Sequence, residues 1–358
     1  KEKGVPVQAY YHQGGHGGPP PIKLMNRWFT RYLHGVENKV EKDARAWIVR
    51  EGSDRNKPKS YEDYPNPAAS PVTFQLVAGA PEMGKLTTAT NSNQGTETVV
   101  DNFSFSGAAL AQADWTEHRL MYLSEKLTEA VHLSGTPRIT IKLASNKPAA
   151  NLSVWLVSLP WNDNKNAKIT DNIITRGWAD PQNHRSLTES EPLVPGRFYD
   201  MTFDLQPDDQ VIPVGQQIGL MIMSSDREFT LRPDPGTELT IDLDATSIQL
   251  PLVGGVKAFA KAATKKTQKK NTKSKKNDSS AVSNTVSSSV SYVVKDTERG
   301  ELHYKNANGE AALKVINSDG KVVFDGPINT KKQKSKVPTE AMKWLEEVNS
   351  KSKELKAE

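Results

Sequence analysis

Residues 44–253 consist of short apolar runs that are separated by Pro, Gly, Asn and Asp. Several of these runs alternate apolar with polar residues, which is the pattern of a β-strand with one buried and one solvated face. We therefore predict a mainly β chain in which residues 44–253 form a β-sandwich, with a jelly roll as the expected topology. The clearest runs are 73–77, 119–123, 139–143, 152–157, 199–205, 218–223 and 239–243.

The first 43 residues predict a strand, a glycine-rich loop and a helix. Residues 5–11 are rich in β-branched and aromatic side chains and are bounded by turn residues, as is typical of a strand. Prolines 19–21 and the apolar residues at helical spacing from Ile22 to Leu33 predict a helix that Gly35 ends.

His12 and His16 lie on the loop between this strand and helix. A loop histidine that follows a rigid strand and has glycines beside it suits a general base. A zinc site is an alternative, because two imidazoles one helical turn apart can share a metal. A helix through the intervening Gln-Gly-Gly would lose roughly 2 kcal/mol relative to alanine. The chain also has no cysteine, so we expect neither a metal nor another cofactor. Plain hydrogen bonding within the loop is the remaining alternative.

The formal net charge of +5 comes from one segment. Nine lysines and no acidic residue lie between residues 256 and 277, so the rest of the chain is net negative and nucleic acid is not an expected partner. Residues 254–289 bury too little apolar surface to offset chain entropy, and we predict a disordered linker there. A solvated spacer is the simpler interpretation of this linker. Attachment to an anionic cell-wall polymer or to lipid head groups through Lys257–Lys276 is the alternative.

Residues 290–358 predict a small α+β module near the lower size limit for independent folding. Asn308-Gly309 and Asp319-Gly320 predict hairpin turns, and Pro338 begins a helix that extends to Val348. The strand-like runs of this module are 291–294, 301–304, 311–316 and 322–324.

The sequence predicts no membrane span, and its first residues lack the apolar core of a signal peptide. It opens at Lys1 on a strand that needs a sheet to join, so we expect a C-terminal piece of a longer protein. The absence of cysteine excludes disulfides and thiol nucleophiles. A secreted or cell-surface location is expected, with a cytoplasmic one as the alternative, and assembly into a homo-oligomer is left open.

Several motifs resemble one family of enzymes. Residues 11–16, Tyr-His-Gln-Gly-Gly-His, and residues 26–29, Asn-Arg-Trp-Phe, resemble the histidine loop of bacterial Xaa-Pro dipeptidyl-peptidases and their cocaine-esterase-like relatives. The resemblance covers roughly residues 5–250. It continues at 122–127, 133–137, 175–178, 192–196 and 215–220.

This resemblance implies that residues 1–43 end an α/β-hydrolase domain and that a jelly roll follows. In the family the catalytic serine, aspartate and histidine occur in that order along the chain. The catalytic histidine corresponds to His16, whereas His12 corresponds to a supporting position. The serine and the aspartate are then expected upstream of Lys1, and the implied substrates are peptides with proline at the second position.

The residues themselves offer no second part of a catalytic triad. A serine hydrolase needs a Gly-x-Ser-x-Gly turn, and Ser106-Gly107 and Ser134-Gly135 both lack the glycine two residues before the serine. The adjacent acids Asp208-Asp209 and Glu346-Glu347 are expected to be solvated.

The leading hypothesis is therefore the C-terminal part of a serine exopeptidase that releases Xaa-Pro dipeptides and is inactive as a fragment. An esterase or acylase of the same family is one alternative, because these enzymes share the histidine loop and the jelly roll. A non-catalytic jelly-roll binding or adhesion protein is the other alternative.

Overall fold

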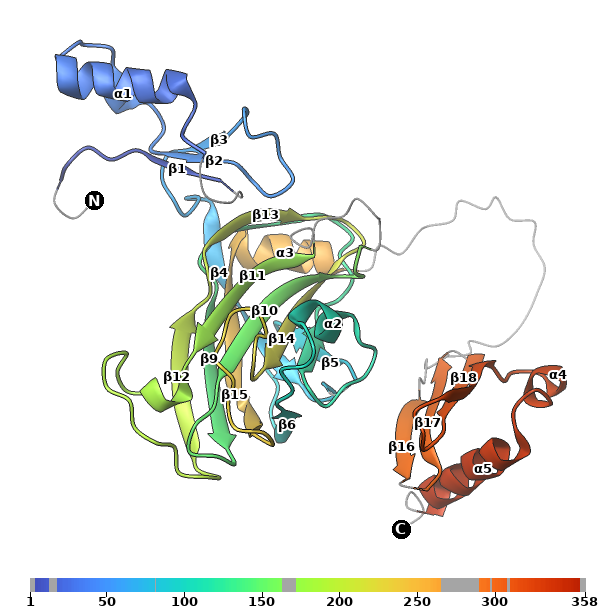
Figure 1. Ribbon diagram of the computed structural model, residues 1–358. Coiled ribbons are helices and arrows are strands. Elements are labelled where there is room, and N and C mark those ends of the chain that lie inside the picture. Colours follow the sequence, from blue (N-terminus) through green and yellow to red (C-terminus); the bar gives the residue numbers. More distant parts are fainter. Residues whose placement is uncertain are drawn as a thin grey trace, which may run out of the picture. The chain divides into compact units, whose positions relative to one another are not determined.

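The structure is a computed structural model that describes residues 4–12, 18–80, 82–162, 172–264, 290–296, 298–307 and 310–354. The chain divides into two compact units, residues 1–269 and residues 270–358 (Figure 1). Both units are rich in strands, so the predicted mainly β class is confirmed. Among the described residues, no helix is both long and apolar enough to cross a membrane.

The first unit begins with a small sheet in the part of the chain that the structure describes. Strand β1 (Ala9–Tyr11) pairs in parallel with β2 (Ala46–Ile48), which pairs antiparallel with β3 (Lys59–Tyr61). The predicted strand is shorter than expected, and Val5, which lies before β1, is 58% exposed. Among the described residues, β2 is the only strand that pairs with β1. The predicted β-sandwich begins at residue 44, but β2 and β3 belong to this small sheet and not to the large one.

The predicted helix forms as α1 (Ile22–His34). Gly35 ends it with a left-handed conformation, φ 70°, and its N–H donates a hydrogen bond to the carbonyl of Arg31, as expected of a C-terminal glycine. A short 3-10 helix, η1 (Val40–Lys42), then leads into β2.

The rest of the first unit is one 12-stranded sheet that folds on itself. The long strand β15 (Glu238–Val253) joins its parts by pairing antiparallel with β4, β6, β8 and β9. The predicted runs all fall on strands of this sheet. Its other strands are β4 (Ala69–Val77), β5 (Gly84–Thr87), β6 (Thr96–Val100), β7 (Leu120–Leu123), β8 (Val131–Gly135), β9 (Arg138–Ser145), β10 (Leu152–Leu159), β11 (Ile173–Ala179), β12 (Phe198–Asp204), β13 (Asp208–Ile212) and β14 (Gln217–Met223).

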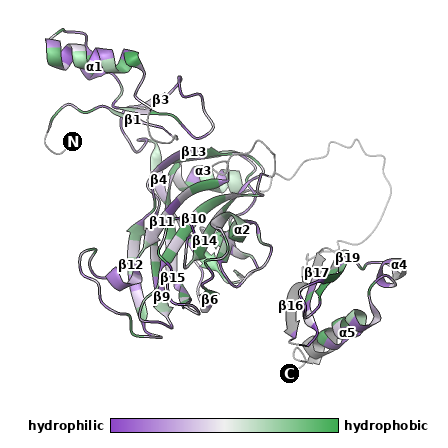
Figure 2. Cartoon of the chain, in the orientation of Figure 1, coloured by the Kyte–Doolittle hydropathy of each residue, from purple (hydrophilic) through white to green (hydrophobic). Residues whose placement is uncertain are grey.

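Strands β7, β10 and β14 are buried on both faces, unlike the strands with one solvated face that the alternating runs predict. One face of each lines the main core, and the other forms a second cluster that includes Met121, Trp155 and Met221. Figure 2 shows hydrophobic residues along β10 and β14. Helix α2 (Gly107–Gln112) contributes Leu110 and Ala111 to this second cluster. A Cβ at Gly107 would collide with the Trp155 ring, so glycine permits the close approach. A 3-10 helix, η3 (Pro181–Asn183), follows β11.

The predicted disordered linker is wrong for its first residues. Residues 255–263 form helix α3 (Gly255–Ala263), whose Phe259 is 5% exposed and packs edge-to-face on Phe74 with ring centroids 4.7 Å apart. Apolar residues at helical spacing outweigh the lysines here, because Lys257 lies on the solvent side and Lys261 pairs with Glu129 at 2.7 Å. The rest of the predicted linker, residues 265–289, lies outside the described residues.

The second unit is a four-stranded antiparallel sheet with a helix. Its strands follow chain order: β16 (Val290–Asp296), β17 (Gly300–Ala307), β18 (Glu310–Ile316) and β19 (Val322–Pro327). After α4 (Lys331–Lys334), helix α5 (Thr339–Glu354) packs Trp344 and Leu345 on Leu302 and Leu313. The predicted helix thus forms and runs six residues further than expected, and Glu346 and Glu347 are exposed. The predicted turn at Asn308-Gly309 lies outside the described residues.

Candidate functional site

The candidate site begins where β1 ends. The carbonyl of Tyr11 accepts a hydrogen bond from the N–H of Val49 at 2.9 Å, and the Tyr11 and Tyr64 rings lie 5.2 Å apart. His12 follows directly, with its ring centroid 5.9 Å from that of Tyr10. Its Nδ1 is buried and has no hydrogen-bond partner among the described residues. His16, the predicted base, lies outside the described residues, so its role stays a prediction.

Arg55 also reaches this site, from the connection between β2 and β3. A Cβ added at Gly18 would collide with the guanidinium of Arg55 and would lie 2.9 Å from Nε2 of His12. The guanidinium and the imidazole therefore meet at the open face of Gly18. Sequence reasoning missed Arg55, because no motif links it to a loop 37 residues earlier.

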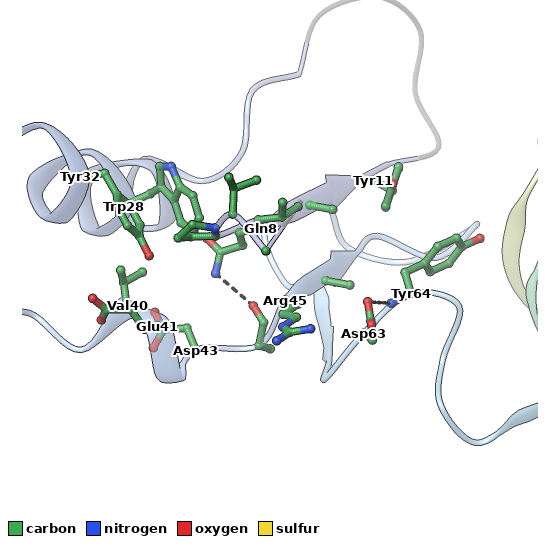
Figure 3. Close-up of a pocket in the computed structure, with 17 residues that line it drawn as sticks. Gln8, Tyr11, Trp28, Tyr32, Val40, Glu41, Asp43, Arg45, Asp63 and Tyr64 are labelled. Atoms are coloured by element: carbon green, nitrogen blue, oxygen red, sulfur yellow. Dashed lines mark hydrogen bonds between the residues drawn. The ribbon is translucent and has the colours of Figure 1, made fainter. Parts of the chain in front are cut away.

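A groove of about 380 Å³ lies beside β1 (Figure 3). Trp28 and Tyr32 of α1 form one wall, and their ring centroids lie 4.5 Å apart. The side chain of Gln8 crosses the groove and donates a hydrogen bond to the carbonyl of Ala44 at 3.0 Å. Its described lining includes neither serine nor histidine.

Two of the lining carboxylates are already engaged. Asp43 accepts hydrogen bonds from Arg27 at 2.7 and 2.9 Å, and Asp63 accepts one from the N–H of Tyr64 at 2.8 Å. Asp43 and Asp63 therefore already have hydrogen-bond partners within the first unit.

Asp209 is the centre of a buried polar cluster, so its predicted solvation is wrong. Its side chain is 2% exposed. It accepts hydrogen bonds from Nε of Arg50 at 2.9 Å and from Oγ of Ser134 at 2.6 Å, and Nε2 of His132 lies 2.9 Å from it. The hydroxyl of Tyr61 lies 3.3 Å away. Asp208 is buried as well.

Burial alone would raise the pKa of Asp209. Hydrogen bonds from His132 and Ser134, together with electrostatic attraction by the side chains of His132 and Arg50, outweigh burial and hold this pKa below its ordinary value. The carboxylate is thus charged at neutral pH.

This cluster contains a serine, a histidine and an aspartate, but it is not a catalytic triad. In a triad the histidine stands between the serine and the carboxylate. Here Ser134 and His132 both contact the carboxylate of Asp209, and Ser134 is fully buried. The cluster instead ties the small sheet, through Arg50 and Tyr61, to β8 and β13 of the large sheet. Among the described residues, no group of three His, Cys, Asp or Glu side chains could hold a metal ion.

Comparison with known proteins identifies the family of the chain. The family profile described as "X-Pro dipeptidyl-peptidase C-terminal non-catalytic domain" matches residues 38–281. A putative Xaa-Pro dipeptidyl-peptidase of Rhodopirellula baltica is 65% identical over 255 residues, which cover 71% of this chain and 41% of the relative. A second, from Bacillus cereus, is 33% identical over 256 residues and is covered to 42%. The chain thus spans about two fifths of the length of these relatives.

The fold also has a counterpart among solved structures. An aminopeptidase from a marine sediment Thaumarchaeota archaeon superposes with a TM-score of 0.50 at 14% sequence identity. The match covers 65% of this chain and 44% of that one, and it concerns the fold alone.

Proposed function

Because this chain belongs to the X-Pro dipeptidyl-peptidase C-terminal non-catalytic domain family, we propose that it is the C-terminal part of a serine exopeptidase that releases Xaa-Pro dipeptides. In this proposal His16 is the general base, and residues upstream of Lys1 in a longer protein supply the serine and the aspartate. The substrates are peptides with proline at the second position.

The observation that carries the proposal is the parallel pairing of β1 with β2, followed by the histidine loop and α1. In α/β sheets, functional residues gather beyond the carboxyl ends of parallel strands, and His12 lies at such an end. Parallel strands are also usually buried within larger sheets, whereas β1 is paired on one side among the described residues. The small sheet and α1 are therefore proposed as the end of an α/β-hydrolase domain, and the large sheet as a jelly roll.

The test uses the longer protein with its upstream residues and a chromogenic Ala-Pro amide. His16→Ala should lower kcat by about 10⁴-fold or more, because the serine then has no proton acceptor. His12→Ala should cost far less and serves as the matched control on the same loop. An essential His12 with a dispensable His16 would overturn the assignment.

The same preparation separates the peptidase from its alternative. Faster turnover of simple acyl esters than of Ala-Pro amides would favour an esterase or acylase. The 358-residue chain alone should hydrolyse neither substrate, and turnover that disappeared in His16→Ala would reveal a nucleophile within this chain.

The lysine-rich segment supports a second proposal, that the chain attaches to an anionic cell-wall polymer and lies at the cell surface. Lys257 and Lys261 lie on α3, where Lys261 pairs with Glu129. The proposed attachment therefore rests mainly on the seven lysines from Lys265 to Lys276.

A further inference from the structure

The connection between β2 and β3, residues 49–58, is anchored to the large sheet at its first turn. The guanidinium of Arg50 contacts the buried carboxylate of Asp209 at 2.9 Å and donates a second hydrogen bond to the hydroxyl of Tyr61 at 2.6 Å. Asp209 is itself held by Ser134 and His132 of β8. The start of the connection is thus fixed by a charged, hydrogen-bonded group that solvent does not reach.

Local hydrogen bonds shape the remainder of the connection. Ser53 donates from its hydroxyl to the carbonyl of Arg50 at 2.6 Å, and Asp54 accepts from the N–H of Asn56 at 2.9 Å. These two turns place Arg55 at the tip. Because Arg50 is anchored to the large sheet and the rest of the connection is folded, the large sheet can determine where Arg55 lies.

The tip meets the histidine loop at both of that loop's described ends. The guanidinium of Arg55 occupies the space beside Gly18 that any Cβ would need, and Nε2 of His12 borders the same space. Gly18 has φ 150°, in the region that favours glycine, so this conformation and the absent side chain together make room for Arg55.

We propose that Arg55 is a positioning residue that holds His12 and Gly18, the described residues on either side of the segment that contains His16. Through Arg50 and Asp209, the large β-sheet sets where Arg55 stands. The large sheet thereby fixes His12 and Gly18, and the catalytic part of this inference rests on the proposed function. A planar guanidinium and a compact ammonium differ in shape, so lysine should replace Arg55 only in part.

The first experiment is independent of activity. Hydrogen exchange is measured on the 358-residue chain for Arg55→Ala, Arg55→Lys and the control Lys57→Ala. Lys57 lies on the same connection, and its recorded ion pair is with Asp54 at 3.7 Å. Arg55→Ala should speed exchange in peptides covering residues 9–20, Arg55→Lys should do so less, and Lys57→Ala should leave it unchanged. Equal exchange in the wild type and Arg55→Ala would overturn the proposal.

The second experiment uses the longer protein with an Ala-Pro amide. Misplacing a catalytic group by about 1 Å can cost about 100-fold in rate, so Arg55→Ala should lower kcat by up to that factor with KM little changed. Arg55→Lys should recover part of the loss, and the pH profile of kcat should shift in Arg55→Ala. Unchanged kcat and pH profile would also overturn the proposal.

The two experiments separate this inference from the proposed function. In one outcome, the longer protein cleaves no Ala-Pro amide while Arg55→Ala still speeds hydrogen exchange at residues 9–20. That result would contradict the proposed function and support the contact of Arg55 with His12 and Gly18. If the enzyme is active, needs His16 and ignores Arg55, the proposed function stands and the positioning role fails.

Discussion

At the scale of single residues, the buried carboxylate of Asp209 contacts several side chains that lie far from it in the sequence. Asp209 contacts four side chains from three other segments of the first unit, and one of them, Arg50, lies 159 residues away in the sequence. A carboxylate with this burial is tolerated because its partners are positively charged or donate hydrogen bonds. Such a group contributes to stability only while it is ionised and its partners remain.

We expect Asp209→Asn to lower the free energy of unfolding of the first unit by about 3 kcal/mol, because the change leaves Arg50 without its buried counter-ion. Urea unfolding followed by tryptophan fluorescence measures this loss. Asp204→Asn is the control, since Asp204 pairs with Arg138 on the surface and is 53% exposed, and its effect should stay within about 0.5 kcal/mol. Equal losses in the two variants would mean that the Asp209 cluster is not a strong anchor.

The pH dependence of this stability follows from the same group. The pKa of Asp209 is lower in the folded than in the unfolded chain, so its contribution is present above the ordinary aspartate pKa of 3.8 and is lost as the pH falls below it. Between about pH 5 and pH 2, the free energy of unfolding should therefore fall more steeply for the wild type than for Asp209→Asn. The same pH dependence of the unfolding free energy in both proteins would contradict the lowered pKa of Asp209.

At the scale of elements, α3 shows how a short helix closes the main core beside a lysine-rich stretch. Phe259 and Ala262 are buried against the large sheet, whereas the lysines of the helix point to solvent or to Glu129. The carbonyl of Ala262 also accepts hydrogen bonds from the N–H and the hydroxyl of Thr128, at 2.7 and 3.0 Å. The helix is thus an integral part of the first unit.

Phe259→Ala should lower the free energy of unfolding by about 3 kcal/mol or more, because it removes a buried ring and leaves a cavity next to Phe74. Lys257→Ala on the exposed side of the same helix should change it by less than about 0.5 kcal/mol. Thermal unfolding of both variants distinguishes the two effects. A Phe259→Ala variant as stable as Lys257→Ala would show that α3 is not docked in solution.

At the scale of the whole molecule, the two compact units are separate folds with separate cores. Seven lysines, Lys265 to Lys276, lie in the sequence between α3 and β16 and outside the described residues.

Binding of these lysines to polyanions should depend strongly on salt. Each lysine near an anionic surface contributes about 1 kcal/mol, and the Debye length falls from about 10 Å at 0.1 M salt to about 3 Å at 1 M. Anionic liposomes or cell-wall preparations should retain the full chain at low salt and release it at high salt. A variant with all seven lysines replaced by serine should bind weakly at both. Equal retention of the two proteins at low salt would show that the segment is only a spacer.

The sequence alone determined the local structure well, because strands, helix ends and turns depend on residues that are near one another in the chain. The period-two runs became strands, and Gly35 ended α1, since each pattern is satisfied by its own neighbours. The family resemblance, carried by motifs across residues 5–250, was confirmed by the comparison with known proteins.

Only the tertiary structure decided which polar residues are buried and which segments meet. The sequence predicts a solvated Asp209 and no role for Arg55, because the partners of both residues lie far away in the sequence. The burial of both faces of β10 and the docking of α3 likewise depend on a second layer that no local pattern encodes. Burial and ion pairing depend on distances in space, and the folded chain alone sets those distances.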